Sequence, residues 1–254
     1  MLKKNYADDV RGEIMVDNNS NVYVVSSTKS TNLPVSASAF QPVFGGGDQD
    51  GCIIKMNQNL TNLIWSSYLG GTNSDACYSI QIDRENNIYV AGGTNSTNFP
   101  TTPGVVHPTY QGGVSDGFIS KINENGTAII ASSYYGSNAY DQVYLTKTDK
   151  SSNVFLFGQT AATGNTFIQN ALWNHPGGGQ FLSKLTPNLQ SIVWSTAFGT
   201  GNGGPDISPT ALLVDYCNNI YMSGWGGPAL NGFGGTSGLP ITPGAFQTTT
   251  DNHD

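Results

Sequence analysis

Residues 17–26, DNNSNVYVVS, contain a phrase that occurs four times in the sequence. It returns as DRENNIYVAG at residues 83–92, DKSSNVFLFG at residues 149–158 and DYCNNIYMSG at residues 215–224. Each phrase begins with an aspartate, and the aspartates at positions 17, 83, 149 and 215 are evenly spaced. A constant period of this size predicts a repeat architecture built from one supersecondary unit.

The period divides the chain into four units: residues 7–72, 73–138, 139–204 and a partial fourth unit at 205–254. Other landmarks keep the same spacing, such as Pro34 with Pro100 and Lys55 with Lys121. In the second unit, short runs such as YSIQID and NNIYVAGG alternate apolar and polar residues, which predicts half-buried strands. Turns rich in Asn, Asp and Gly separate these runs.

We therefore expect four antiparallel strands in each unit and no helix. An isolated four-stranded sheet has two faces to cover, and stacking one unit on the next covers both. The predicted fold is all-β: a β-propeller, or an arc of a propeller, with one blade for about 66 residues. In each phrase we expect the aliphatic residues of the second strand to face one neighbouring blade. The aromatic residue between them should face the other.

The repeated polar residues are interpreted as architecture, because a side chain needed identically in every blade stabilises the frame. Each aspartate is expected to accept hydrogen bonds within its turn, with an asparagine four residues later. These predicted turn residues are Asp17, Asp83, Asp149 and Asp215, with Asn21, Asn87, Asn153 and Asn219. Calcium binding is the alternative, both here and at Asp48 and Asp50 in GGGDQDGC, but neither place offers a complete ligand set. We expect no metal and no cofactor.

Composition excludes some partners. Charged residues are 11% of the chain and the formal net charge is −7, so nucleic acid is not an expected partner. No apolar stretch is long enough for a membrane span. The odd number of cysteines, three, does not indicate a disulfide framework. The first residues, MLKKNYADDV, lack the apolar segment of a secretory signal.

The sequence contains no recognisable catalytic constellation. Its histidines, His107, His175 and His253, match no metal-binding or catalytic spacing, and we expect the first two in surface loops. The segment GTGNGG at residues 199–204 resembles a nucleotide-binding loop, but proline-rich sequence follows it where a helix is required. We predict no catalytic residues and no enzymatic activity.

The most individual segment lies in the fourth unit. The stretch from Gly224 to Pro240 is twice as long as the equivalent stretch from Gly92 to Pro100. The additional residues are rich in glycine, and loops on a rigid scaffold often carry recognition. The candidate binding residues are therefore Trp225, Asn231 and Phe233. The alternative is that the aromatic rings pack on the neighbouring blade.

Three stretches resemble the bacterial SBBP family of β-propeller repeats: IDRENNIYVAGGTNSTNFPTTPG at 82–104, GGVSDGFISKINENG at 112–126 and SGLPITPGAFQ at 237–247. The fourth unit also resembles segments of large secreted surface proteins of gliding bacteria, which often carry a type IX secretion sorting domain. The resemblance implies a propeller module and an extracellular or cell-surface location, and it supplies no catalytic residues. Signal and sorting segments are absent from the sequence, and the fourth unit lacks its last two strands. We expect a piece of a larger protein with further blades.

Three functions are compatible with these observations. The leading hypothesis is a non-enzymatic scaffold or adhesion module of a secreted surface protein, with a protein or a glycan as its partner. The second is a carbohydrate-binding propeller that uses aromatic loop residues. The third is a propeller enzyme, such as a lyase or hydrolase, because fold alone does not exclude catalysis.

Overall fold

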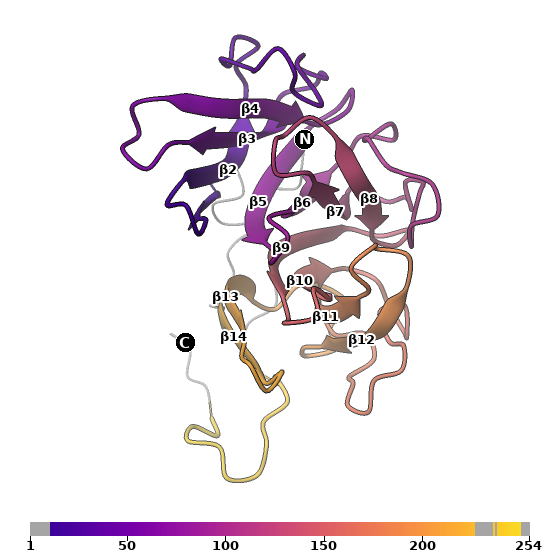
Figure 1. Ribbon diagram of the computed structural model, residues 1–254. Helices are drawn as coiled ribbons and strands as arrows, with labels where there is room; N and C mark the ends of the chain where they lie inside the picture. Colours follow the sequence, from indigo (N-terminus) through magenta and orange to yellow (C-terminus); the bar gives the residue numbers. More distant parts are fainter. Residues whose placement is uncertain (1–10, 227–235, 237, 250–254) are drawn as a thin grey trace.

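The computed structural model describes residues 11–226, 236 and 238–249, and in these residues the only regular secondary structure is β-strand (Figure 1). The first sheet contains β1 (Glu13–Val16), β2 (Val22–Thr28), β3 (Asp50–Met56) and β4 (Leu63–Leu69). The second contains β5 (Asp75–Ile82), β6 (Ile88–Thr94), β7 (Asp116–Ile122) and β8 (Ile129–Tyr135). The third contains β9 (Asp141–Thr148), β10 (Val154–Thr160), β11 (Gln180–Leu185) and β12 (Ile192–Phe198). The last pair is β13 (Ser208–Val214) and β14 (Ile220–Trp225).

Each sheet is an antiparallel meander in which strands pair in sequence order. The first strands, β1, β5, β9 and β13, lie towards the centre, and the sheets extend outward from them (Figure 1). The all-β prediction is therefore confirmed, and the four-stranded sheets are consistent with propeller blades. In the part of the chain that the structure describes, the sheets are not closed into a ring.

Polar contacts join the inner strands. The carboxylate of Glu13 accepts hydrogen bonds from Ser79 Oγ at 2.6 Å and from the Ile80 amide at 2.8 Å. Its other oxygen lies 3.2 Å from Lys147 Nζ, so this side chain of β1 contacts both β5 and β9. Arg11, just before β1, donates to the carbonyl of Pro209 in β13 at 2.9 Å. These contacts tie the first strands together across nearly the whole described chain.

The expected alternation along the second strands is confirmed. Ile88 and Val90 of β6 are buried in the cluster shared with the first sheet, while Tyr89 belongs to the cluster shared with the third sheet. In β10, Val154 and Leu156 face the second sheet, whereas Phe155 and Phe157 face β13 and β14. Because side chains of a strand alternate between its faces, one strand contributes to two inter-blade cores.

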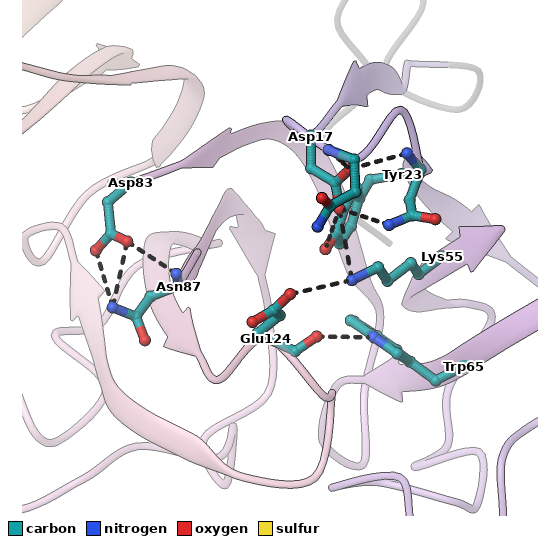
Figure 2. Close-up of polar contacts among 9 residues, drawn as sticks. Asp17, Tyr23, Lys55, Trp65, Asp83, Asn87 and Glu124 are labelled. Atoms are coloured by element: carbon teal, nitrogen blue, oxygen red, sulfur yellow. Dashed lines mark hydrogen bonds and ion pairs between the residues drawn. The ribbon is translucent and has the colours of Figure 1, made fainter. Parts of the chain in front are cut away.

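The turn between the last two strands of the second blade contacts the outer part of the first blade (Figure 2). Trp65 on β4 donates its indole N–H to the carbonyl of Glu124, in the turn between β7 and β8, at 3.0 Å. The amide of Phe40 donates to the carbonyl of Gly126 in the same turn. Gly126 has a φ of +66°, and a Cβ at this position would overlap the Trp65 ring. The equivalent contact between the next two blades is the bond from the Val106 amide to the Leu189 carbonyl, at 2.8 Å.

No described residue lies in a helix long and apolar enough to span a membrane.

Replacing Trp65 by alanine should weaken the junction between the first two blades. The side chain is 4% exposed and loses both its packing and its hydrogen bond, so the free energy of unfolding should fall by about 3 to 5 kcal/mol. Trp173→Ala is the matched control, because Trp173 is 55% exposed and its removal should cost less than about 1 kcal/mol. Denaturant unfolding followed by tryptophan fluorescence and circular dichroism measures both. Equal losses would contradict the role of this junction.

Candidate functional site

Each repeated aspartate closes the turn between the first and second strands of its sheet. Asp17 accepts hydrogen bonds at Oδ1 from the amides of Asn19 and Asn21, at 2.9 and 2.8 Å. The Asn21 side chain donates to Asp17 Oδ2 at 2.9 Å. The same pattern of backbone and side-chain bonds occurs at Asp83 with Asn87, Asp149 with Asn153 and Asp215 with Asn219. All eight predicted turn residues therefore lie in four copies of one turn.

A lysine on the third strand reaches three of these turns. Its ammonium lies 3.6 Å from Asp17 for Lys55, 3.4 Å from Asp83 for Lys121 and 2.8 Å from Asp149 for Lys184. The same nitrogen lies over the aromatic ring of the second strand, 4.9 Å from the centroid of Tyr23 and 5.0 Å from that of Tyr89. In the first blade, Lys55 also lies 3.7 Å from Glu124 of the second blade (Figure 2).

Hydrogen bonding favours the ionised form of Asp17 and of Asp149. Burial favours the neutral acid at Asp17, but the hydrogen bonds from Asn21 and Asn19 and the charge of Lys55 outweigh burial, so the pKa of Asp17 is lowered. At Asp149, burial is likewise outweighed by Lys184 and by the hydrogen bonds of its turn, and the pKa is lowered. A carboxylate that is saturated in this way is a poor general base, which favours a structural role for these turns.

The four turns converge on one open cavity of about 340 Å³. The residue that directly follows each aspartate lines it: Asn18, Arg84, Lys150 and Tyr216. These four residues occupy equivalent positions of the repeat, and all four are exposed. We call this feature the four-turn cavity. It places four different side chains on four identical turns.

The four-turn cavity offers two cations and an aromatic ring. Among the described residues, neither Arg84 nor Lys150 forms an ion pair, while the neighbouring Asp83 and Asp149 are already neutralised by lysines. Tyr216 is 83% exposed, which is unusual for so large a side chain. This combination suits a ligand with an anionic group and a surface that stacks on a ring.

Sequence reasoning missed the four-turn cavity because it concentrated on the residues that repeat. The available signal was a position that varies. The residue directly after each repeated aspartate is Asn, Arg, Lys or Tyr, and it differs in each of the four repeats. The period alone does not predict the meeting of these four residues, Asn18, Arg84, Lys150 and Tyr216. It does not say whether the blades surround a common centre.

The candidate binding residues from the fourth unit lie elsewhere. Trp225 is the last residue of β14, at the end of the strand away from the turn of Tyr216, and is 48% exposed. The structure does not bring Trp225 to the four-turn cavity. Asn231 and Phe233 lie outside the described residues.

Aspartates at the opposite ends of the strands are buried. Asp50 and Asp75 are 0% exposed, and a Cβ built on Gly70 would lie 2.7 Å from an oxygen of each, so the two carboxylates flank Gly70. Asp48, by contrast, is exposed. Asp50 begins β3, and its Oδ2 accepts a hydrogen bond from the amide of Gly45 while Oδ1 has no hydrogen bond.

The same arrangement occurs one unit later with Asp116 and Asp141, both 0% exposed. Burial raises the pKa of Asp75 and Asp116 to about 7, and that of Asp50 and Asp141 to about 6. In residues 11–226, 236 and 238–249, no group of three His, Cys, Asp or Glu side chains is arranged to hold a metal ion. These carboxylates are thus proton-binding groups inside the blades.

The two histidines that the structure describes are not simple surface residues. His107 stacks on Tyr135 with ring centroids 6.0 Å apart, and burial lowers its pKa. Its Nδ1 and that of His175 are both buried without a hydrogen-bond partner. Both histidines lie in loops, as expected, but they are only partly exposed because these loops fold back over the outer strands.

Part of the chain matches a known family of repeats. Residues 64–100 match the SBBP beta-propeller repeat. The matched segment runs from β4 through β5 and the Asp83 turn to β6 and Pro100, so it spans the junction between two blades of this propeller-type chain. No curated protein sequence matches the chain.

Replacing Asp83 by alanine should destabilise the second blade. The change removes the hydrogen bonds to Glu85 and Asn87 and leaves Lys121 without its partner, at a cost of about 3 kcal/mol. Asp215→Ala removes an equivalent turn that is exposed and has no lysine, so its cost should be smaller. Urea unfolding of both variants makes the comparison, and a larger loss for Asp215→Ala would contradict this account.

The buried aspartates predict that the protein is more stable in mild acid than in mild base. Their pKa values are higher in the folded chain than the value near 3.9 of an unfolded aspartate, so the folded state binds more protons between about pH 4 and pH 8. The free energy of unfolding should be at least about 2 kcal/mol larger at pH 5 than at pH 8. Thermal unfolding at several pH values measures this slope.

The double variant Asp75→Asn/Asp116→Asn is the control. It keeps the shape of the neutral acids and leaves only Asp50 and Asp141 with raised pKa values, so the difference in stability between pH 5 and pH 8 should become clearly smaller. His107 acts in the opposite direction below about pH 6.5, since its lowered pKa favours the unfolded chain there, but it is present in both proteins. An unchanged slope in the double variant would overturn the assignment.

Proposed function

We propose that this chain is a non-enzymatic interaction module whose ligand binds at the four-turn cavity. One observation carries the proposal. The repeat holds four turns in the same conformation, yet the exposed residue after each aspartate differs, and all four meet at one cavity of about 340 Å³. The residues that hold the turns are constant, whereas the exposed residues that meet at the cavity vary. This combination suits the recognition of a ligand.

The chemistry of the four-turn cavity favours binding over catalysis. The carboxylates next to it are saturated by hydrogen bonds, and two of them are neutralised by lysines. The histidines that the structure describes, His107 and His175, do not line it. A lyase or hydrolase would need an acid and a base converging on one point. We therefore propose that the ligand leaves the module unchanged.

The setting we propose is a secreted protein of a bacterial cell surface, in which this module contributes to adhesion. The support is the low charge content, the richness in Gly, Asn, Ser and Thr, and the resemblance to repeats of secreted surface proteins. Its partner would be a protein or a glycan outside the cell. Neighbouring blades of the same parent protein are the other partners that this setting implies.

An acidic glycan is the more specific candidate ligand. Tyr216 provides an exposed ring on which a sugar can stack, and Arg84 and Lys150 provide charges for a carboxylate or sulfate group. A protein ligand with an acidic, aromatic-binding surface would use the same residues. The two candidates differ in whether an isolated oligosaccharide is sufficient.

An array that carries neutral, sialylated, sulfated and uronic-acid glycans beside acidic and basic extracellular proteins tests the proposal. The chain should bind acidic glycans, and the Arg84→Ala/Lys150→Ala variant and Tyr216→Ala should each bind at least about tenfold more weakly. Lys29→Ala is the matched control, because Lys29 is an exposed lysine away from the cavity.

Binding to protein spots alone would favour the protein ligand, provided that the same variants lose it. Binding that these variants leave unchanged would remove the four-turn cavity as the site. Recovery of a chemically altered glycan would contradict the non-enzymatic assignment.

A further inference from the structure

The outer edge of β14 lacks the strand that covers the equivalent edges in the other sheets. β2, β6 and β10 each lie between a first and a third strand, whereas β14 pairs only with β13 in the described part of the chain. The consequence is visible in burial, because β10 is buried along its whole length and every residue of β14 after Ile220 is exposed. Tyr221 is 55% and Met222 41% exposed.

The backbone direction along β14 follows from its turn. The Asp215 amide donates to the Asn219 carbonyl, so Asn219 directs its polar groups towards β13. In an antiparallel pair these directions alternate along the strand. The backbone N–H and C=O groups of Tyr221 therefore point towards β13. Those of Ile220 and Met222 point to the free edge. Such an edge is a template for another strand.

A charge is also unpaired at this edge. In the first three sheets, the lysine of the third strand lies directly opposite the aromatic residue of the second: Tyr23 with Lys55, Tyr89 with Lys121 and Phe155 with Lys184. Each lysine then contacts the aspartate of the turn. Asp215 and Tyr221 reproduce the other half of this arrangement, and Asp215 forms no ion pair among the described residues.

The face of the third blade beside β14 carries an apolar cluster whose residues are at most 9% exposed. Phe157, Leu182 and Phe198 form a cluster there, which Leu212 of β13 covers in part. In the second sheet, the residues on the corresponding side of the third strand are Phe118 and Ile122, which pack in the core shared with the preceding blade. They stand three residues before and one residue after Lys121.

We propose that the free edge of β14 binds an extended partner strand that carries a lysine opposite Tyr221. The strand runs antiparallel to β14 and bonds to the backbone of Ile220 and Met222. Its lysine lies over the Tyr221 ring and contacts Asp215. Apolar residues three before and one after the lysine face the third blade.

A peptide with the sequence of residues 115–126, SDGFISKINENG, is the probe, because it contains this pattern. Fluorescence anisotropy of the labelled peptide with the intact chain measures affinity. The same peptide with methionine in place of its lysine should bind at least about tenfold more weakly, since it leaves Asp215 unpaired. Asp215→Asn in the protein should cause a similar loss, and the two changes together should cost little more than either alone.

Amide exchange supplies a readout that non-specific adhesion would not reproduce. Binding should slow exchange at Ile220 and Met222 and leave the Tyr221 amide unchanged. Asp48→Asn, an exposed acid elsewhere, should not alter peptide affinity, and neither should Arg84→Ala/Lys150→Ala. The result is thus independent of the two cations of the four-turn cavity. No binding, equal binding of the methionine peptide, or protection at residues other than the edge amides would each overturn the proposal.

Discussion

The contact between an ionised aspartate, its asparagine and a lysine organises each complete blade. The aspartate accepts two backbone amides of its turn, so it fixes where the second strand starts. The lysine arrives from the third strand and lies over the aromatic ring of the second, which links three strands through one charge. Because the lysine is nearly buried, the pair is sensitive to the loss of either partner.

The repeat separates the positions that hold each turn from a position that varies. Positions that hold the turn are the same in all four copies, whereas the position directly after the aspartate changes from Asn18 to Arg84, Lys150 and Tyr216. That position is exposed, so it can change without disturbing packing. The proposed ligand site and the proposed strand-binding edge use two different features of the same repeat. One uses side chains that the frame leaves variable, and the other uses a copy of the frame in which the lysine is missing.

The junctions between blades combine apolar packing with buried acids. Alternation of side chains gives β6 and β10 two buried faces, and each face enters a different core. At one end of the junctions, Asp75 and Asp141 lie close to Asp50 and Asp116 with little solvent, which raises their pKa values. These acids oppose stability at neutral pH unless they hold protons. The stability of the blades therefore depends on pH through buried acids that do not line the four-turn cavity.

Much of the fold could be predicted from the sequence, because its causes are local. Period-2 alternation decides which side chains of β6 and β10 are buried, and the even spacing of the repeated phrase decides that the blades are equivalent. The turn residues could be identified because an aspartate acts on amides only two and four positions away. A constant phase also marks Asn18, Arg84, Lys150 and Tyr216 as equivalent. Their convergence depends on how whole sheets stack, which no local rule describes.

Tertiary structure alone decided the functional geometry. It buried Asp50 beside Asp75, placed Trp225 away from the four-turn cavity and, among the described residues, left β14 paired only with β13. The physical reason is distance along the chain. Strand pairing and turn bonds act between near neighbours, while cavities, buried charges and free edges arise from contacts between sheets that belong to different repeats of the sequence.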